Sequence, residues 1–71
     1  MISQHDQDRW TINAMIEHGG GFVKALGNAA LRADDRNLAI IKKAFPDYWT
    51  YYQDIGEHMR KDDEAKEANE C

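Results

Sequence analysis

The chain has little of what small proteins use to stabilise a fold covalently. It has 71 residues and one cysteine, Cys71, which is the last residue, so no disulfide can form within the chain. A domain of this size buries only about 60% of the surface that its unfolded chain exposes. Small domains without disulfides commonly gain stability from a metal or a second subunit. We therefore expect a homo-oligomer, with a dimer as the simplest form.

Long hydrophobic runs and an export signal are also missing. No stretch approaches the roughly 18 apolar residues that cross a membrane, and the first six residues are mostly polar and contain no apolar run. A single thiol without a signal peptide is typical of a reducing compartment, which predicts the cytoplasm and no membrane partner.

An excess of positive charge is absent too. The chain has 9 Lys and Arg against 13 Asp and Glu, a net charge of −4, which disfavours nucleic acid as a partner. Five bases and two acids lie between residues 19 and 45, whereas five acids and three bases lie between residues 60 and 71. Solvated helix faces would explain this pattern, and the alternative is an acidic tail that steers a basic partner.

Groups for covalent or metal-assisted catalysis are scarce. Ser3 is the only serine, and neither it nor Cys71 lies near a base in a recognisable arrangement. His18-Gly19-Gly20-Gly21 matches the oxyanion loop of some esterases, but the Gly-x-Ser-x-Gly elbow is missing. The histidines His5, His18 and His58 have no zinc-site spacing. We expect a protein that is not an enzyme and has no metal or other cofactor.

What the chain does contain is a run of three glycines, Gly19–Gly21, between two segments with helical periodicity. Their entropic cost predicts a corner that other residues cannot form, with Gly19 as the left-handed residue that ends the first helix. Amides at the start of the next helix lack intrahelical partners and attract phosphate or carboxylate, unless water or Glu17 satisfies them. The candidate anion-binding residues are His18, Gly20, Gly21 and Lys24.

The spacing of apolar residues predicts an all-α fold, a compact small domain of about four short helices with helix-turn-helix joints and no sheet. Asp34 and Asp35 indicate a break and an N-cap, and Pro46 ends one helix and begins the next. The alanine-rich second helix is expected to lie centrally, with Gly27 on its outer side. The expected helices span Asp6 or Asp8 to Glu17, Gly20 or Gly21 to about Ala33, Arg36 to Ala44, and Pro46 or Asp47 to about Lys61.

These helices make one domain, residues 1–61, followed by an acidic tail, 62–71, which is either a frayed end or a solvated helical extension. Within the helices, the residues expected to face inward are Ile12, Met15, Ile16, Phe22, Val23, Leu26, Ala29, Ala30, Ala33, Leu38, Ile41, Ala44, Phe45, Tyr48, Trp49, Tyr52, Ile55 and Met59.

The densest aromatic group is Tyr48-Trp49-x-Tyr51-Tyr52. Aromatic residues at helical spacing usually belong to a core, yet four of them in five positions cover more than one face of a helix. Tyrosine and tryptophan are enriched at binding hot spots. We therefore expect Tyr51 and one neighbour to be partly exposed. The candidate surface for a partner or for self-association comprises Tyr48, Trp49, Tyr51 and Tyr52.

A wider pattern runs from Trp10 to Tyr52. It includes Ala14-Met15, His18-Gly19-Gly20-Gly21-Phe22-Val23, Ala33-Asp34 and Ala44-Phe45-Pro46-x-Tyr48-Trp49. This pattern resembles a group of short proteins encoded in bacteriophage and prophage genomes. The resemblance implies a viral accessory protein in the cytoplasm of a bacterial host. It would bind and modulate a host or phage protein, for example as an inhibitor of host defence of the anti-CRISPR kind. It assigns no functional residues.

Two other functions remain open on the sequence. The glycine-rich helix start would suit a binder of anions or nucleotides. A purely structural oligomer, such as a component of a virion, is the third possibility.

Overall fold

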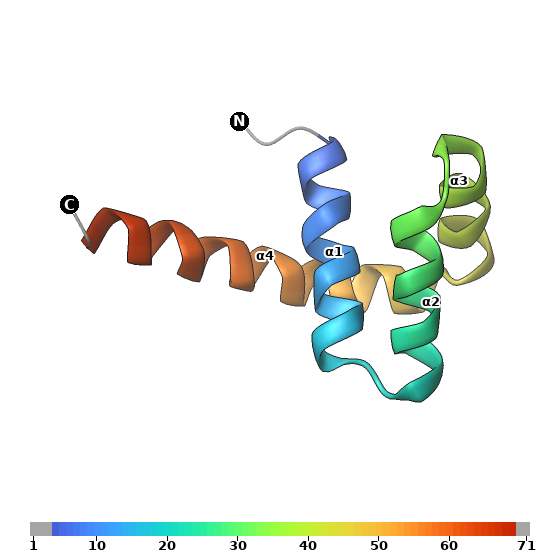
Figure 1. The fold of residues 1–71 in the computed structure, drawn as a ribbon, viewed down its shortest axis with the longest axis horizontal. Coiled ribbons are helices and arrows are strands. Elements are labelled where there is room, and N and C mark those ends of the chain that lie inside the picture. The colour runs from blue at the N-terminus through green and yellow to red at the C-terminus, as the bar shows by residue number, and fades with distance from the viewer. Residues whose placement is uncertain (1–3, 70–71) are drawn as a thin grey trace.

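The computed structural model describes residues 4–69, with side chains described from Asp6 to Glu64, and these residues form helices and short joints without any strand. The predicted all-α fold is confirmed (Figure 1). Its helices are α1 (Gln4–His18), α2 (Gly21–Arg32), α3 (Asp35–Ala44) and α4 (Pro46–Asn69).

Local signals place the joints where the sequence predicted them. Asp34 is the N-cap of α3, and its Oδ1 accepts a hydrogen bond from the Asn37 amide at 2.8 Å. Pro46 is the first residue of α4, where its missing N–H costs nothing. The helix α4 does not end near Lys61 as predicted but continues to Asn69, so residues 62–69 form the helical extension. Residues 70 and 71, including Cys71, lie outside the described residues.

The central element is α1, and the prediction that α2 lies centrally is wrong. The helix α1 packs against both α2 and α4, which contact each other little (Figure 1). Its Thr11, Ala14 and Met15 are completely buried, and the Thr11 hydroxyl donates to the Gln7 carbonyl at 2.9 Å. The helix α1 therefore takes the central place that was wrongly given to α2.

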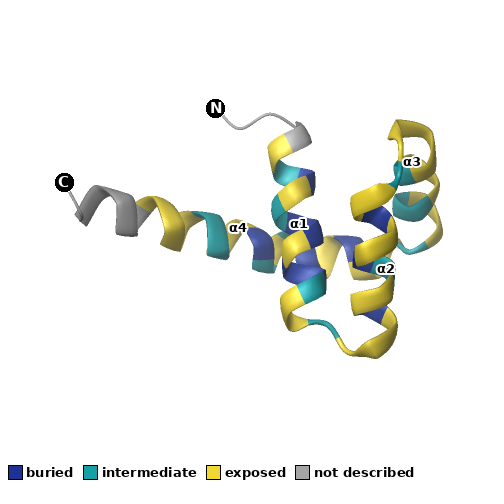
Figure 2. Ribbon diagram, viewed as in Figure 1, coloured by how far each residue is buried: buried dark blue, intermediate teal, exposed yellow. Residues whose placement is uncertain are grey.

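The core lies where α1 meets α2 and α4, as Figure 2 shows. No residue of α3 is fully buried, which leaves that helix loosely covered on its apolar side. Four residues were expected to face inward and are exposed: Phe22, Ala29, Ala44 and Tyr48. The buried apolar residues are Ile12, Ala14, Met15, Val23, Ala30, Trp49 and Tyr52, and the half-buried residues packed on them are Ile16, Leu26, Leu38, Ile41, Ile55 and Met59.

Two glycines inside helices permit this packing. A Cβ atom on Gly56 of α4 would lie 2.6 Å from the Trp10 carbonyl oxygen, so α1 and α4 touch backbone to backbone. A Cβ atom on Gly27 of α2 would lie 3.0 Å from Met15 Cβ. The expectation that Gly27 faces outward is therefore wrong, because it is buried at the contact between α2 and α1.

The triglycine corner is less demanding than its composition suggests. None of its glycines has a positive φ, so the left-handed conformation predicted for Gly19 is absent. A Cβ atom on Gly19 would nonetheless collide with the Met15 carbonyl oxygen and crowd Val23, whereas Gly20 and Gly21 have open space around them. The requirement for glycine is thus steric, and it holds at Gly19 alone.

One polar assembly joins three helices at the edge of the core. Lys42 of α3 places its Nζ 2.8 Å from Oδ2 of Asp8 in α1, and Asp8 is buried. The same ammonium group lies 5.3 Å from the centre of the Trp49 ring in α4. The face of an aromatic ring attracts a cation at such a distance. This assembly therefore adds to the packing of the half-buried Leu38 and Ile41, which attach α3 to the core.

We predict that Gly56→Ala destabilises the protein by about 2–3 kcal/mol, because the added methyl group must push α1 and α4 apart. Gly21→Ala is the matched control. It should leave the free energy of unfolding unchanged or raise it by up to about 1 kcal/mol, because the site is open and alanine restricts the unfolded chain. Urea unfolding followed by circular dichroism measures both. Equal midpoints for the two variants would contradict the close crossing.

We also predict that Lys42→Ala lowers the free energy of unfolding by about 1–2 kcal/mol, between the values typical of exposed and buried ion pairs. The change removes the ammonium that neutralises Asp8 and covers Trp49. Lys43→Ala, at the exposed neighbouring position, should have an effect within about 0.5 kcal/mol. The comparison is made by urea unfolding, and an equal loss for both variants would contradict a special role for Lys42.

Candidate interaction surface

Three aromatic rings from different segments meet at the surface. Phe22 belongs to the first turn of α2, Phe45 is the joint between α3 and α4, and Tyr48 belongs to the first turn of α4. The ring centres of Phe22 and Phe45 are 5.7 Å apart, those of Phe22 and Tyr48 6.0 Å, and those of Phe45 and Tyr48 6.2 Å. These are favourable distances for aromatic pairs. We call Phe22, Phe45 and Tyr48 the aromatic cluster.

The chain connections around Pro46 hold the cluster in place. The Phe45 amide donates to the Ile41 carbonyl at 2.9 Å and thereby closes α3. The Phe45 carbonyl accepts from the Trp49 amide at 3.0 Å and thereby begins α4. A joint of one residue leaves Phe45 little freedom. The cluster therefore rests on fixed backbone at two of its three positions.

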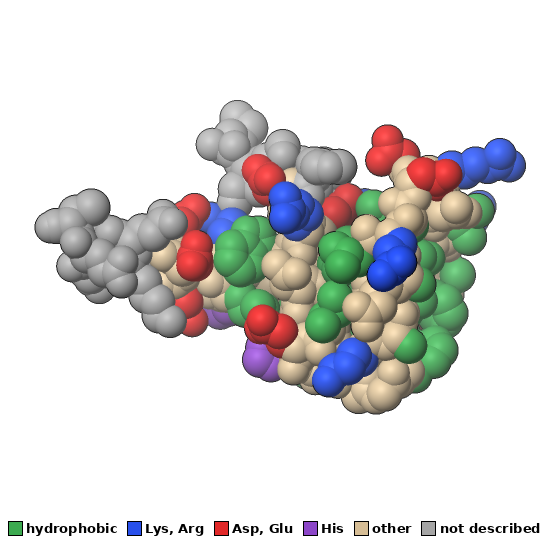
Figure 3. All heavy atoms as spheres, in the orientation of Figure 1, with side chains coloured by type: hydrophobic (Ala, Val, Ile, Leu, Met, Phe, Trp, Pro, Cys, Tyr) green, Lys and Arg blue, Asp and Glu red, His purple; other side chains and the backbone are tan. Residues whose placement is uncertain are grey.

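The cluster remains open to solvent. Phe22 is 58% exposed and Tyr48 43%, whereas the neighbouring Trp49 is 6% exposed and Tyr52 9%. Figure 3 shows hydrophobic side chains along the side of the molecule where α2 and α3 lie. Single exposed apolar residues are ordinary, but a group held together at the surface is typical of an interaction site.

The predicted surface on α4 is therefore only partly a surface. Tyr48 and Tyr51 reach solvent, whereas Trp49 and Tyr52 are buried and belong to the core, which corrects their place in the candidate surface. The expectation that Tyr51 and one neighbour are exposed is confirmed. Tyr51 does not join the aromatic cluster, because its ring packs edge-on against Tyr52 with the centres 5.0 Å apart.

The sequence missed Phe22 as a surface residue, because its spacing placed it on an inward face, and Phe45, also expected to face inward, is half-buried. Their position along the helices carried a usable signal. Both phenylalanines and Tyr48 lie at a helix end or in a joint, and such positions fall at the rim of a small bundle rather than over its centre. Periodicity alone does not distinguish the two places.

The four candidate anion-binding residues lie around the corner before α2. Gly20 is the N-cap and has no side chain that could accept from the first amides, and Glu17 makes no such hydrogen bond either. His18, Gly20, Gly21 and Lys24 are all exposed. The backbone of Lys24 donates to the Gly20 carbonyl at 2.8 Å, and its ammonium group makes no ion pair among the described residues. Anion binding stays a prediction.

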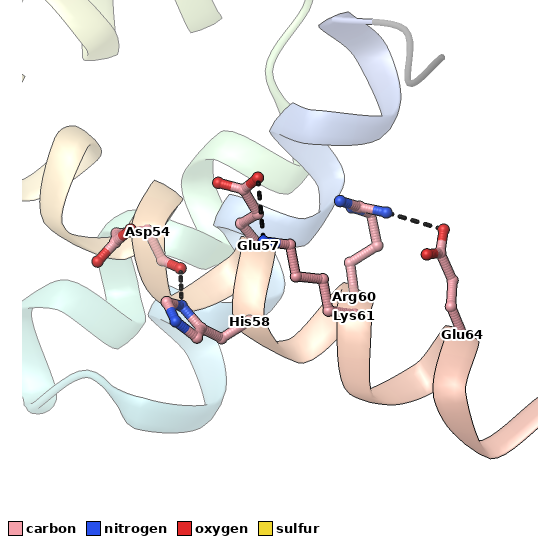
Figure 4. A network of polar contacts seen from close by, with 6 residues as sticks. All are labelled: Asp54, Glu57, His58, Arg60, Lys61 and Glu64. Carbon is pink, nitrogen blue, oxygen red and sulfur yellow. Dashed lines mark hydrogen bonds and ion pairs between the residues drawn. The ribbon is translucent and has the colours of Figure 1, made fainter.

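The polar groups of α4 pair with one another along the helix (Figure 4). Arg60 lies 2.8 Å from Glu64 and Lys61 4.0 Å from Glu57, both at a spacing of four residues. The Nδ1 atom of His58 lies 2.8 Å from the Asp54 carbonyl, to which it donates when protonated. Such pairs support a helix that stands alone. They lie along α4 between residues 54 and 64 and do not converge on a reaction centre.

No group of three metal-binding side chains occurs among the described residues. The side chain of His5 lies outside them. Within residues 4–69, no helix has the length and apolar character needed to cross a membrane.

The chain matches no protein-family model, no curated protein and no solved structure.

We predict that Phe22→Ala reduces the free energy of unfolding by less than about 1 kcal/mol, because more than half of this side chain is already in water. Trp49→Ala should cost about 3–5 kcal/mol, since it opens a cavity in the core. Urea unfolding of both variants distinguishes a surface residue from a core residue. Similar losses would contradict the division of the aromatic residues described above.

Proposed function

We propose that the protein is a small non-enzymatic binding protein that modulates another protein by covering part of its surface. The aromatic cluster carries this proposal. Three rings held at fixed separations and left half-exposed resemble the central anchors of protein interfaces. Rigid aromatic side chains lose little conformational entropy on binding, because few torsions remain to be fixed.

The resemblance to phage-encoded accessory proteins supports a host or phage protein as the partner, with inhibition of host defence as one such role. The charge of the chain supports a basic partner. Asp62 and Asp63 are exposed on the projecting part of α4 and form no ion pair within the described residues. A negative field of this kind accelerates encounter with positively charged surfaces.

The distribution of carboxylates supports binding rather than catalysis. Asp34 caps α3, and Glu57 and Glu64 pair with bases along α4. Catalytic acids and bases instead converge on a pocket, where they can reach one substrate. The second candidate, an anion or nucleotide binder, draws its support from the uncapped start of α2 and the exposed Lys24.

We predict that a double substitution, Phe22→Ala with Tyr48→Ala, weakens binding to the partner at least about tenfold by removing two anchors. The partner is identified by comparing what immobilised wild-type and variant proteins capture from a bacterial lysate. Its affinity for purified proteins is then measured by calorimetry.

Tyr51→Ala is the matched control, because Tyr51 is an exposed aromatic residue outside the cluster. It should leave the affinity unchanged. Lys24→Ala tests the second candidate, since an anionic ligand would lose its cation while a partner on the cluster would remain bound. A partner held equally by the wild type and the double variant would refute the proposed role of the cluster.

A further inference from the structure

A second surface feature lies at the opposite end of α2. It is a hollow of about 310 Å³ between the first half of α1, the end of α2 and the start of α3. These segments lie near one another in Figure 1. Ile12, Ala30, Ala33 and Leu38 line it, and all four are buried or half-buried. Its lining thus has an apolar part formed by three helices.

Leu31 borders the same hollow and is 57% exposed. A large apolar side chain in water therefore stands beside a hollow whose lining is partly apolar and also includes the buried Asp8. In a monomer the side chain of Leu31 remains largely uncovered. The apolar part of the hollow could therefore accept an apolar side chain such as that of Leu31.

The edges of the hollow carry opposite charges. Arg9 lies on the α1 side and Asp35 on the α3 side, and both are exposed. Neither forms an ion pair within the part of the chain that the structure describes. One surface thus combines an apolar projection, an apolar depression, a cation and an anion.

We infer that this surface binds a second copy of the chain in a symmetric dimer. A two-fold interface brings the same patch of both copies together, so the patch must contain its own complement. Here Leu31 of each copy would enter the hollow of the other, and Arg9 of each copy would face Asp35 of the other. An unrelated partner would not require both halves of each complementary pair on one surface.

The chain exposes more surface than a compact monomer of its mass would. Its accessible surface is 5277 Å². This is roughly 800 Å² more than the about 4,500 Å² expected for a compact monomer. A standard interface buries about 800 Å² on each partner. The projecting end of α4 contributes to the excess, and so does the loose cover over α3.

The dimer surface and the aromatic cluster can act separately. Phe22 and Leu31 are nine positions apart on α2, which corresponds to about 13 Å along the helix axis. The two surfaces therefore lie at opposite ends of α2 and are tested by different variants. For this reason, failure of one proposal does not imply failure of the other.

Sedimentation equilibrium over a wide range of protein concentrations tests the inference. The wild type should dimerise reversibly, and Leu31→Asp should raise the dissociation constant at least about tenfold, because it places a charge in the apolar contact. Ile40→Asp is the matched control, since Ile40 is 55% exposed on α3 and does not line the hollow. It should leave the dissociation constant unchanged. Circular dichroism confirms that each variant folds.

Exchange of the two charges identifies the contact itself. Arg9→Asp and Asp35→Arg should each weaken the dimer, because each brings like charges together at two places. The two changes combined should restore binding towards the wild-type value, as an interaction between these residues requires. A wild type that stays monomeric at every concentration overturns the inference. A dimer that tolerates Leu31→Asp also overturns it, as does a double exchange that binds no better than either single change. Loss of the dimer in Ile40→Asp, or in Phe22→Ala with Tyr48→Ala, overturns it as well.

Discussion

The contact on which the fold depends is the crossing of α1 and α4, where two backbones touch. Gly56 faces the peptide group between Trp10 and Thr11, and a methyl group would lie 2.6 Å from the Trp10 carbonyl oxygen. Helices usually keep their axes 8–10 Å apart because side chains fill the space between them. Glycine at the crossing removes that spacer. Trp49 and Tyr52 of α4 are then buried beside α1, and they supply the aromatic part of a small core.

The same arrangement determines what remains outside. Because α1 occupies the centre, α2 and α4 each give one face to it and scarcely contact each other. The helix α3 contributes no fully buried residue, and the contacts of Lys42 with Asp8 and Trp49 link it to α1 and α4. Phe22, Tyr48 and Leu31 consequently find incomplete cover within one chain. The exposed apolar groups follow from the small size of the core.

Signals that act within a few residues allowed the helices and joints to be predicted from the sequence. Asp34 as a cap, Pro46 as a start and the glycine corner depend on neighbours along the chain. The central position of α1 depends on how far apart separate helices pack, which periodicity does not report. Gly27 illustrates the difference, because the helical pattern led us to place it on the outer side of α2 and only the contact with Met15 shows its use. For the same reason the sequence proposed four surface aromatics on α4, of which two are core residues.

The two surface features differ in the kind of complement they require. The aromatic cluster presents rings of one chemical character, so a partner must supply a matching apolar depression of its own. The hollow between α1, α2 and α3 holds a projection and a depression together, with Arg9 and Asp35 at its edges. In the dimer that we propose, symmetry makes the second arrangement self-sufficient, whereas we propose a different protein as the partner of the first. Self-association would thus cover the end of α2 that the core leaves bare while keeping the cluster at its start available for recognition.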